Sequence, residues 1–411
     1  MHTGTLLGRL LREMRMHKAR ARVLVAVVGA LVVGKVATLT GLGRGLRKAR
    51  CGRHAGKGRG GGRRGRRRPL RAKHQIKRVD RLLGNKFLCK ETRQVCSALA
   101  KKVLLGHQRP VLLVDWTHLD AQHSALVAAV PTSGRSVPLY FEVHPRLWVG
   151  KRVVERRFLA ALEEVVPTGV RPCIVADAGF RNPWFKALVR MGWPLVGRLT
   201  SRVLIARGTL PWERASNIHA QAGAAPQSLG RCRVAKTSPV ELTVILSKKF
   251  TRNPLRSAAH RRATHRGRGQ SAKNAARRAQ EPWLLVTTLE DLSAREVVAI
   301  YARRMQIEET FRDAKNPRFG WSLSHARVST QDRFTVLLLV VMLAFWTLLV
   351  LGKAAERVEM QRRFQANTVR HRRVFSLFFL AIQVLEHGDA AELTQEELLE
   401  AFETLFASLG V

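Results

Sequence analysis

Acidic residues are scarce in this sequence. Only 29 of the 411 residues are Asp or Glu, against 73 Lys or Arg, and the formal net charge is +44. Hydrophobic residues still make up 46% of the chain, which excludes a disordered basic tail and leaves room for a sizeable core. The positive charge favours nucleic acid as the partner, with an anionic membrane surface as the second possibility.

Cysteine is also scarce, and its pattern excludes two kinds of site. The five cysteines include no C-x-x-C pair, and no group of His and Cys has zinc-ligand spacing. An odd, scattered set of cysteines indicates a reducing compartment without disulfides or a zinc knuckle. His118 and His123 flank a predicted strand and are interpreted as incidental.

Two segments contain no acidic residue at all. Residues 41–79 hold 16 Lys or Arg, and residues 251–280 hold nine. Within the first, residues 57–68 (KGRGGGRRGRRR) are of low complexity. They form either an arm that follows phosphates or a solvated, disordered arm with no defined target.

The C-terminus has the opposite charge. Residues 386–411 contain seven acidic residues and no basic one. Thr394 and Glu397 form a capping box, and apolar residues then recur at helical spacing. We predict an acidic amphipathic helix that packs on the core, with a partner-binding or dimer helix as the alternative.

Long apolar runs are few. Residues 334–352 are 19 uncharged residues, which is long enough to span a bilayer. Residues 23–34 resemble the core of a signal peptide, but no convincing cleavage site follows. We expect residues 334–352 to be a buried helix of a soluble core, and a membrane-associated basic protein is the alternative.

The order of predicted elements indicates an α/β fold with a mixed sheet and helices on both faces. Residues 206–280 interrupt this order and are interpreted as an insertion. Predicted strands span residues 110–117, 123–130, 137–143, 170–176, 195–204 and 283–289, and predicted helices span residues 151–166, 181–191 and 293–315.

Two aspartates lie on apolar strands, where a carboxylate needs a cation, a metal or hydrogen bonds. Asp115 is inside PVLLVDWT, and Asp177 ends the strand in CIVADAGF. Either residue alone is best explained by a capped turn or an ion pair with an arginine. A third feature favours a functional role for both.

That feature is the predicted helix 293–315, which carries Tyr301, Arg304, Glu308 and Lys315. On one continuous helix these side chains fall within an arc of about 60°. Glu309 and Asp313 lie off this face, so the geometry selects Glu308. An ordinary ion pair of Arg304 with Glu308 would explain neither Tyr301 nor the alignment. One carboxylate beside a tyrosine and two cations suits a phosphate backbone that passes over a metal ion, because divalent cations stabilise the attacking and leaving oxygens of phosphodiester cleavage.

These residues resemble the DDE transposases of bacterial insertion sequences, specifically the insertion-sequence 4 type. The resemblance covers residues 70–380 and rests on the tyrosine-arginine-glutamate-lysine signature together with other blocks: KHQIKRVDRLLGN, VDWT, GRSVPLYFE, DAGFRNPWF, WLLVTT and QANTVRHRRVFS. The first 70 residues do not resemble the family.

The resemblance implies an RNase H-like catalytic fold with a β-rich insertion and helical N- and C-terminal regions. It implies that Asp115, Asp177 and Glu308 bind two Mg²⁺ ions, for which Mn²⁺ can substitute. It also implies that Tyr301, Arg304 and Lys315 position DNA phosphates. Five segments are expected: a basic helical DNA-binding region (1–105, with 39–70 considered for disorder), the first part of the core (106–205), the insertion (206–281), the second part of the core (282–354) and a helical C-terminal region (355–411).

A transposase of this kind cuts its element free and joins the 3′ ends to a target. The implied partners are double-stranded DNA, as the element's terminal repeats and the target, and a second copy of the chain in a synaptic dimer. The implied location is the bacterial cytoplasm, in association with the nucleoid and without a membrane. The alternative function is a catalytically inactive relative that occupies the element ends.

Overall fold

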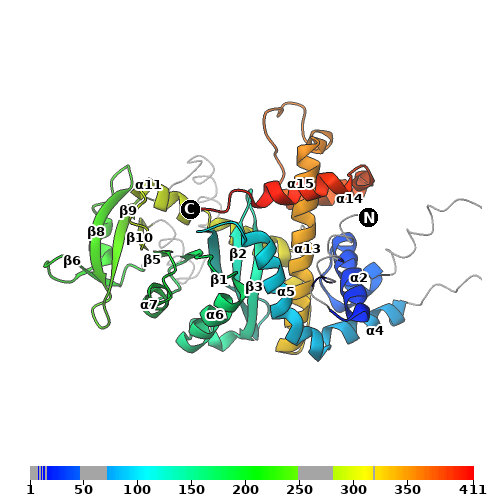
Figure 1. The fold of residues 1–411 in the computed structure, drawn as a ribbon, viewed down its shortest axis with the longest axis horizontal. Coiled ribbons are helices and arrows are strands. Elements are labelled where there is room, and N and C mark those ends of the chain that lie inside the picture. Colours follow the sequence, from blue (N-terminus) through cyan, green and yellow to red (C-terminus); the bar gives the residue numbers. More distant parts are fainter. Residues whose placement is uncertain are drawn as a thin grey trace, which may run out of the picture. The chain divides into compact units, whose positions relative to one another are not determined.

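The computed structural model describes residues 16–46, 72–248, 281–317 and 320–411, together with residues 8, 11 and 13 (Figure 1). The chain divides into two compact units. The first unit is Met1–Val170 with Met305–Gly410, and the second is Arg171–Arg304. The low-complexity run 57–68 and the basic segment 251–280 lie outside the described residues. Residues 39–46 are helical.

The first unit contains three antiparallel strands in the order β3-β2-β1: β1 (Val111–His118), β2 (His123–Pro131) and β3 (Ser136–Pro145). Asp115 lies opposite Val127 on β2, and Val127 lies opposite Phe141 on β3. Side chains paired in this way share one face of a sheet. Asp115 therefore shares a face of the sheet with the apolar side chains of Val127 and Phe141.

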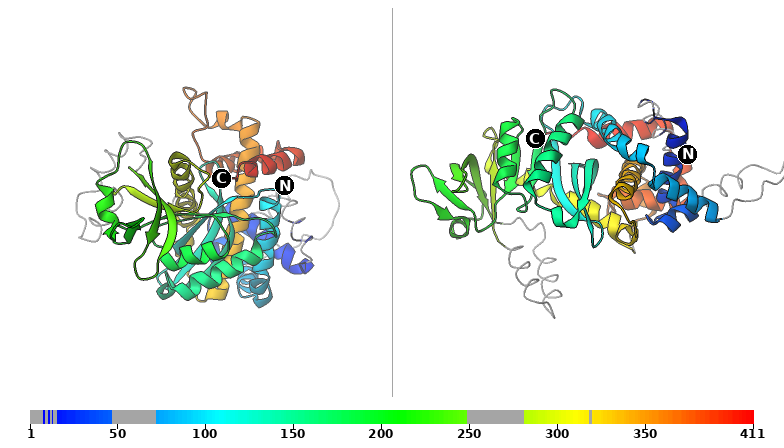
Figure 2. Two further views of the ribbon diagram at one scale, coloured as in Figure 1. Left: turned by 60° about the vertical axis from the view of Figure 1, so that its left-hand side comes forward. Right: turned by 90° about the horizontal axis from the view of Figure 1, so that it is seen from below.

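Helices of the first unit pack on this sheet and on one another (Figures 1 and 2). They are α2 (Lys18–Gly34), α4 (Ala72–Leu83), α5 (Lys86–Leu104), α6 (Arg152–Val165), α12 (Met305–Lys315), α13 (Gln331–Arg357), α14 (Leu377–His387) and α15 (Gln395–Phe406), with short 3₁₀ turns η1 (Arg146–Trp148), η2 (Leu323–His325), η3 (Met360–Arg363) and η4 (Asp389–Ala391).

Helix α13 is the centre of this packing. Its N-terminus is capped by Thr330, whose hydroxyl accepts a hydrogen bond from the Arg333 amide. Its side chains pack on β3, α2, α4, α5, α14 and α15. The ring of Phe345 lies 4.6 Å from that of Trp321 and 5.0 Å from that of Phe378, centroid to centroid. Within the described residues α13 is the one unbroken helix long and apolar enough to cross a membrane, and 94% of that stretch is buried in the protein. The prediction of a buried core helix is therefore confirmed.

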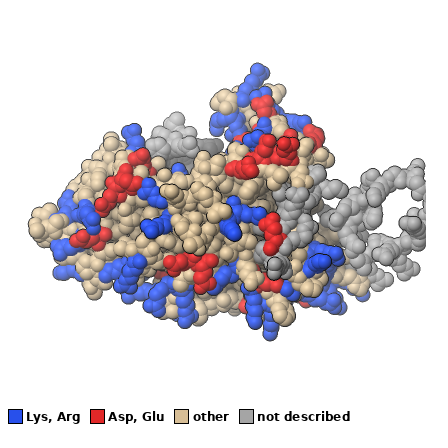
Figure 3. Space-filling model, viewed as in Figure 1, with Lys and Arg blue, Asp and Glu red and all other residues tan. Residues whose placement is uncertain are grey.

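The acidic C-terminal helix packs on the core, as predicted. Thr394 and Glu397 form the capping box that begins α15. Leu398 and Leu405 are buried, and the ring of Phe402 lies 5.4 Å from that of Trp346 on α13. The acidic side chains face outward and gather over α15 in Figure 3.

The second unit is a sheet of seven strands in the order β4-β5-β10-β9-β8-β6-β7. Only β4 and β5 pair in parallel, and the other neighbours are antiparallel. The elements are β4 (Cys173–Ala176), α7 (Asn182–Arg190), β5 (Leu195–Arg198), β6 (Leu204–Arg207), β7 (Glu213–Arg214), α8 (Ala215–His219), β8 (Gln227–Val234), β9 (Val240–Ser247), β10 (Trp283–Thr287) and α11 (Ala294–Ala302). The segment predicted as an insertion is β-rich, and its strands continue the sheet because β9 pairs with β10.

Two predicted elements are each divided in the structure. The strand expected at 195–204 is two strands, β5 and β6. The single helix expected at 293–315 is wrong, because α11 ends at Ala302 and α12 begins at Met305, with a turn at Arg303 and Arg304. The cause is tertiary packing: α11 packs on β5, β8 and β9, whereas α12 packs on β1, β2 and β3.

A pair of helix-interior glycines tests the packing of α13. A Cβ at Gly352 would clash with the backbone carbonyl of Leu377, so we expect Gly352→Ala to lower the free energy of unfolding by about 1–3 kcal/mol. Gly29 in α2 has nothing near its Cβ position, so Gly29→Ala should raise stability by up to about 1 kcal/mol. Urea unfolding of both variants checks this, and equal effects would contradict the close approach.

Candidate active site

Asp115 lies in the middle of β1 and is half-buried. Its Oδ1 accepts a hydrogen bond of 2.8 Å from the Trp116 amide. The charge of Asp115 acts on Lys315, at the C-terminus of α12, and raises the pKa of that ammonium group. A strand thus holds the carboxylate rigidly, and a helix brings a positive charge to it.

Lys315 lies in largely apolar surroundings. Burial lowers the pKa of Lys315, and the charge of Asp115 opposes this effect. The lysine lines a small cavity of about 40 Å³ between β1, β2, β3, α12 and α13, whose other walls are mainly apolar. Its Nζ lies 5.6 Å from the ring centroid of Phe311. A cation in such surroundings interacts more strongly with an anion than one in water does.

Glu308 and Lys315 lie on one face of α12, because seven residues make about two helical turns. Glu308 is half-buried. The other two acids of this helix have a different partner: Glu309 and Asp313 both form ion pairs with Arg135, in the turn between β2 and β3. Ion pairs with Arg135 therefore give Glu309 and Asp313 a structural role.

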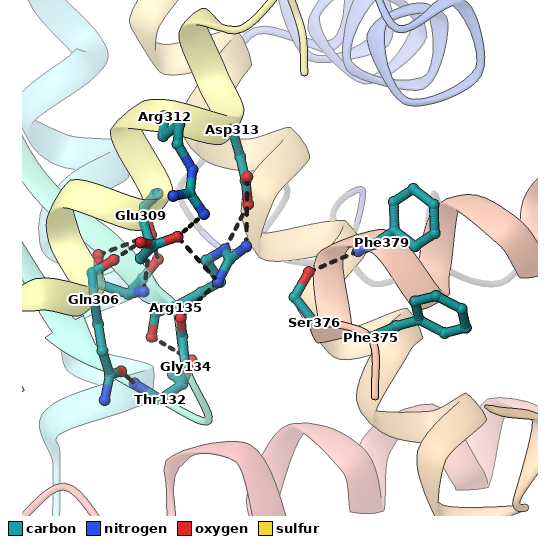
Figure 4. Close-up of polar contacts among 12 residues, drawn as sticks. Thr132, Gly134, Arg135, Gln306, Glu309, Arg312, Asp313, Phe375, Ser376 and Phe379 are labelled. Carbon is teal, nitrogen blue, oxygen red and sulfur yellow. Dashed lines mark hydrogen bonds and ion pairs between the residues drawn. The ribbon is translucent and has the colours of Figure 1, made fainter. Parts of the chain in front are cut away.

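The β2–β3 turn fastens α12 along its length (Figure 4). Arg135 Nε donates to Asp313 Oδ2 at 2.5 Å. The Thr132 amide donates to Gln306 Oε1 at 2.8 Å. The Ser136 amide donates to the hydroxyl of the buried Thr310, also at 2.8 Å. Contacts on three successive turns of α12 fix its rotation about its own axis, and so they fix the direction in which Glu308 points.

The second unit holds the other predicted site residues. Asp177 directly follows β4, and its Oδ1 accepts a 2.8 Å hydrogen bond from the Gly179 amide. Tyr301 lies near the end of α11 and is only 3% exposed, with its ring 4.9 Å from that of Trp283 at 75°. Burial raises the pKa of the Tyr301 phenol, while the charges of Arg304 and Arg198 lower it and that of Asp177 raises it. Two arginines and a carboxylate thus act on the Tyr301 hydroxyl.

The predicted residues therefore form two groups. Asp115, Glu308 and Lys315 belong to the first unit, and Asp177, Tyr301 and Arg304 belong to the second. The single helix expected to carry four of them is two helices, α11 and α12. Sequence reasoning missed Arg198, whose charge acts on Tyr301 and which no sequence pattern marks. It also missed the role of Arg135, although its motif GRSVPLYFE was noticed.

The donor chemistry of the predicted ligands fits a hard divalent cation. Carboxylate oxygens are the ligands that Mg²⁺ prefers, and two or three of them suffice because the ion keeps several waters. In the part of the chain that the structure describes, no three His, Cys, Asp or Glu side chains gather closely enough to hold a metal.

A family model described as the transposase DDE domain matches residues 106–347, more than half of the chain. The chain belongs to the DDE transposase family. The match runs from just before β1 into α13 and includes all six predicted site residues. The mixed α/β fold with flanking helices is consistent with the RNase H-like fold of a DDE transposase, and this prediction is confirmed. No curated protein matches the chain.

The contact between the β2–β3 turn and α12 can be tested with two arginines that differ in burial. Arg135→Ala removes a nearly buried ion pair with Asp313, so we expect it to lower the free energy of unfolding by about 1–3 kcal/mol. Arg312→Ala removes an exposed partner of Glu309, so its effect should stay below about 1 kcal/mol. Hydrogen exchange of α12 amides should rise only in Arg135→Ala. Equal protection in both variants would contradict the proposed fastening.

Proposed function

We propose that this DDE transposase moves an insertion sequence of the insertion-sequence 4 type by cut-and-paste transposition. Asp115, Asp177 and Glu308 are proposed as the catalytic carboxylates and as the ligands of two Mg²⁺ ions, for which Mn²⁺ can substitute. The reaction is hydrolysis of a phosphodiester at each element end, followed by transfer of the freed 3′ end to target DNA.

The observation that carries this proposal is the placement of Glu308 on α12, two helical turns before Lys315. Glu309 and Asp313 are bound by Arg135, and Glu308 lies on the face that it shares with Lys315. Lys315 in turn acts electrostatically on Asp115. This supports Glu308 and Asp115 as members of one site in the first unit, and the family pattern adds Asp177.

The reaction needs an in-line displacement at phosphorus. A water or a 3′-hydroxyl attacks, a bond to the phosphorus forms, and the opposite P–O bond breaks as the leaving oxygen takes the electron pair. Bound divalent cations would stabilise the charge on the attacking and leaving oxygens. The chain's own contribution is to hold the three carboxylates on rigid elements: Asp115 on β1, Asp177 at the end of β4 and Glu308 on α12.

Three further residues are proposed to position DNA phosphates. Lys315 supplies an ammonium group whose stem lies along apolar surface, and this limits its movement. Arg304 supplies a guanidinium group suited to two parallel hydrogen bonds with a phosphate. The Tyr301 ring is buried, so its part is taken by the hydroxyl, which interacts with Arg304.

The proposed partners follow from this chemistry. They are double-stranded DNA, as terminal repeats and as target, and a second copy of the chain in the synaptic complex. The proposed site of action is the bacterial cytoplasm, in association with the nucleoid. A catalytically inactive relative that occupies the element ends is the other candidate, and the experiment below decides between the two.

Neighbouring glutamates provide the test. Glu308→Gln should lower Mg²⁺-dependent cleavage of DNA that carries the element's ends by more than about 100-fold, because even outer partners of metal ligands cost about 10- to 100-fold. Glu309→Gln has the same chemistry one residue away, and its cleavage should stay within about tenfold of the natural protein. Both variants should keep their affinity for the same DNA.

Each outcome assigns a function. If the natural protein and Glu309→Gln cut while Glu308→Gln binds without cutting, the proposed carboxylate is supported. If Glu309→Gln loses cleavage and Glu308→Gln keeps it, the assignment on α12 is wrong. If none of the three proteins cuts although all bind, the chain is the inactive, element-end-binding relative.

A further inference from the structure

The η1 turn places a large apolar side chain in water. Leu147 is 86% exposed, the largest exposed fraction among the big hydrophobic residues that the structure describes. Trp148 is 40% exposed and Val153, at the start of α6, is 50% exposed. Single exposed apolar residues are common, but three of them within seven positions form a small apolar surface.

This surface is rigidly held. The ring of Trp148 stacks on that of His144 at 6.1 Å and 29°, and Lys151 Nζ lies 5.8 Å from the Trp148 ring centroid. His144 is itself held by Glu142, whose Oε2 is 3.0 Å from His144 Nε2. The Arg146 amide donates to the Gln122 carbonyl at 2.6 Å. Trp148 therefore has an aromatic ring and a cation beside it, so it anchors the turn that carries the exposed Leu147.

The rim of this apolar surface is basic. Its exposed cations are Arg146, Lys151, Arg152, Arg156 and Arg157. In the described part of the chain none of these five forms an ion pair with an acidic residue, although many other arginines do. Basic side chains are visible over α6 in Figure 3. A protein surface for another apolar protein would not need so many cations, whereas a phosphate backbone does.

The turn lies at the end of the sheet where the β1 strand also ends. His118, the last residue of β1, pairs with Ser124 on β2. The residue before Ser124 is His123, which pairs with Pro145 on β3, and Pro145 directly precedes η1. The charges of Arg146 and Lys315 both contribute to lowering the pKa of His118, after burial. The apolar turn is thus near the end of α12 that carries Lys315.

We propose that the η1 turn is a DNA wedge, in which Leu147 inserts between base pairs while the surrounding cations bind the flanking phosphates. Leucine is one of the residues that proteins insert between base steps to unstack and kink a duplex. This proposal rests on the proposed function, because it takes the DNA of the transposition reaction as its ligand. Its consequence for that reaction is distortion of the duplex close to the first-unit site residues.

Salt dependence separates the two parts of this surface. DNA binding is measured without divalent metal on a short duplex with a dye at each end. Leu147→Ser should weaken binding about tenfold and reduce the bend seen by energy transfer, while the slope of log affinity against log salt stays unchanged. Arg152→Ser should instead lower the magnitude of that slope by about 0.9. Leu147→Met, which keeps an apolar side chain, should restore both affinity and bend.

Leu210 is the matched control, because it is also an exposed leucine, at 56%, and it lies in the second unit next to β7. Leu210→Ser should bind and bend DNA like the natural protein. If Leu147→Ser does the same, the wedge is overturned while the proposed function stands. If Leu147→Ser changes only the sedimentation of the free protein, the surface joins two copies of the chain, and the wedge is overturned. If the natural protein binds no DNA at all, the proposed function falls with it.

Discussion

The apolar middle of α13 is the constraint on which the first unit is built. A helix that is apolar on every side must be covered on every side. The β3 strand and the helices α2, α4, α5, α14 and α15 provide that cover. Helix α12 also takes part, because side chains of α12 and α13 line the cavity beside Lys315. The positions of Glu308 and Lys315 therefore depend on hydrophobic burial that starts well away from either residue.

Acidic residues are the limiting partner in a chain with 73 basic and 29 acidic side chains. In the described structure several of them form ion pairs that join elements. Asp313 joins α12 to the β2–β3 turn, and Glu356 binds both Lys353 and Arg373 near the end of α13. Many cations are left facing solvent, where their mutual repulsion opposes the compact state. A bound polyanion relieves this repulsion, so DNA binding and stability of the folded chain are linked.

The sequence predicted the elements whose signal is local. Short apolar runs located the β1, β2 and β3 strands, and a capping box located the start of α15. The turn between α11 and α12 could not be predicted, since no Gly or Pro occurs at 303–304 and the break follows from packing on different strands.

The sequence also pointed to individual residues of the candidate site, but not to the contacts around them. An aspartate in an apolar strand pointed to Asp115 without any knowledge of its neighbours. The choice of Glu308 over Glu309 was also made from the sequence, but on the assumption of one continuous helix. The ion pairs of Glu309 and Asp313 join them to Arg135, more than 170 positions away, and no local pattern reveals such a pair.

The turn at Arg303 and Arg304 gives the spacings of the tyrosine-arginine-glutamate-lysine signature two different meanings. From Glu308 to Lys315 the spacing is a helical phase, and one inserted residue would rotate Lys315 by about 100° away from Asp115. From Arg304 to Glu308 the spacing includes the junction of two separately packed helices, so there it sets only the length of the connecting chain. The Glu308–Lys315 spacing tolerates no change in length, whereas the Arg304–Glu308 spacing limits only how far apart these two residues can lie.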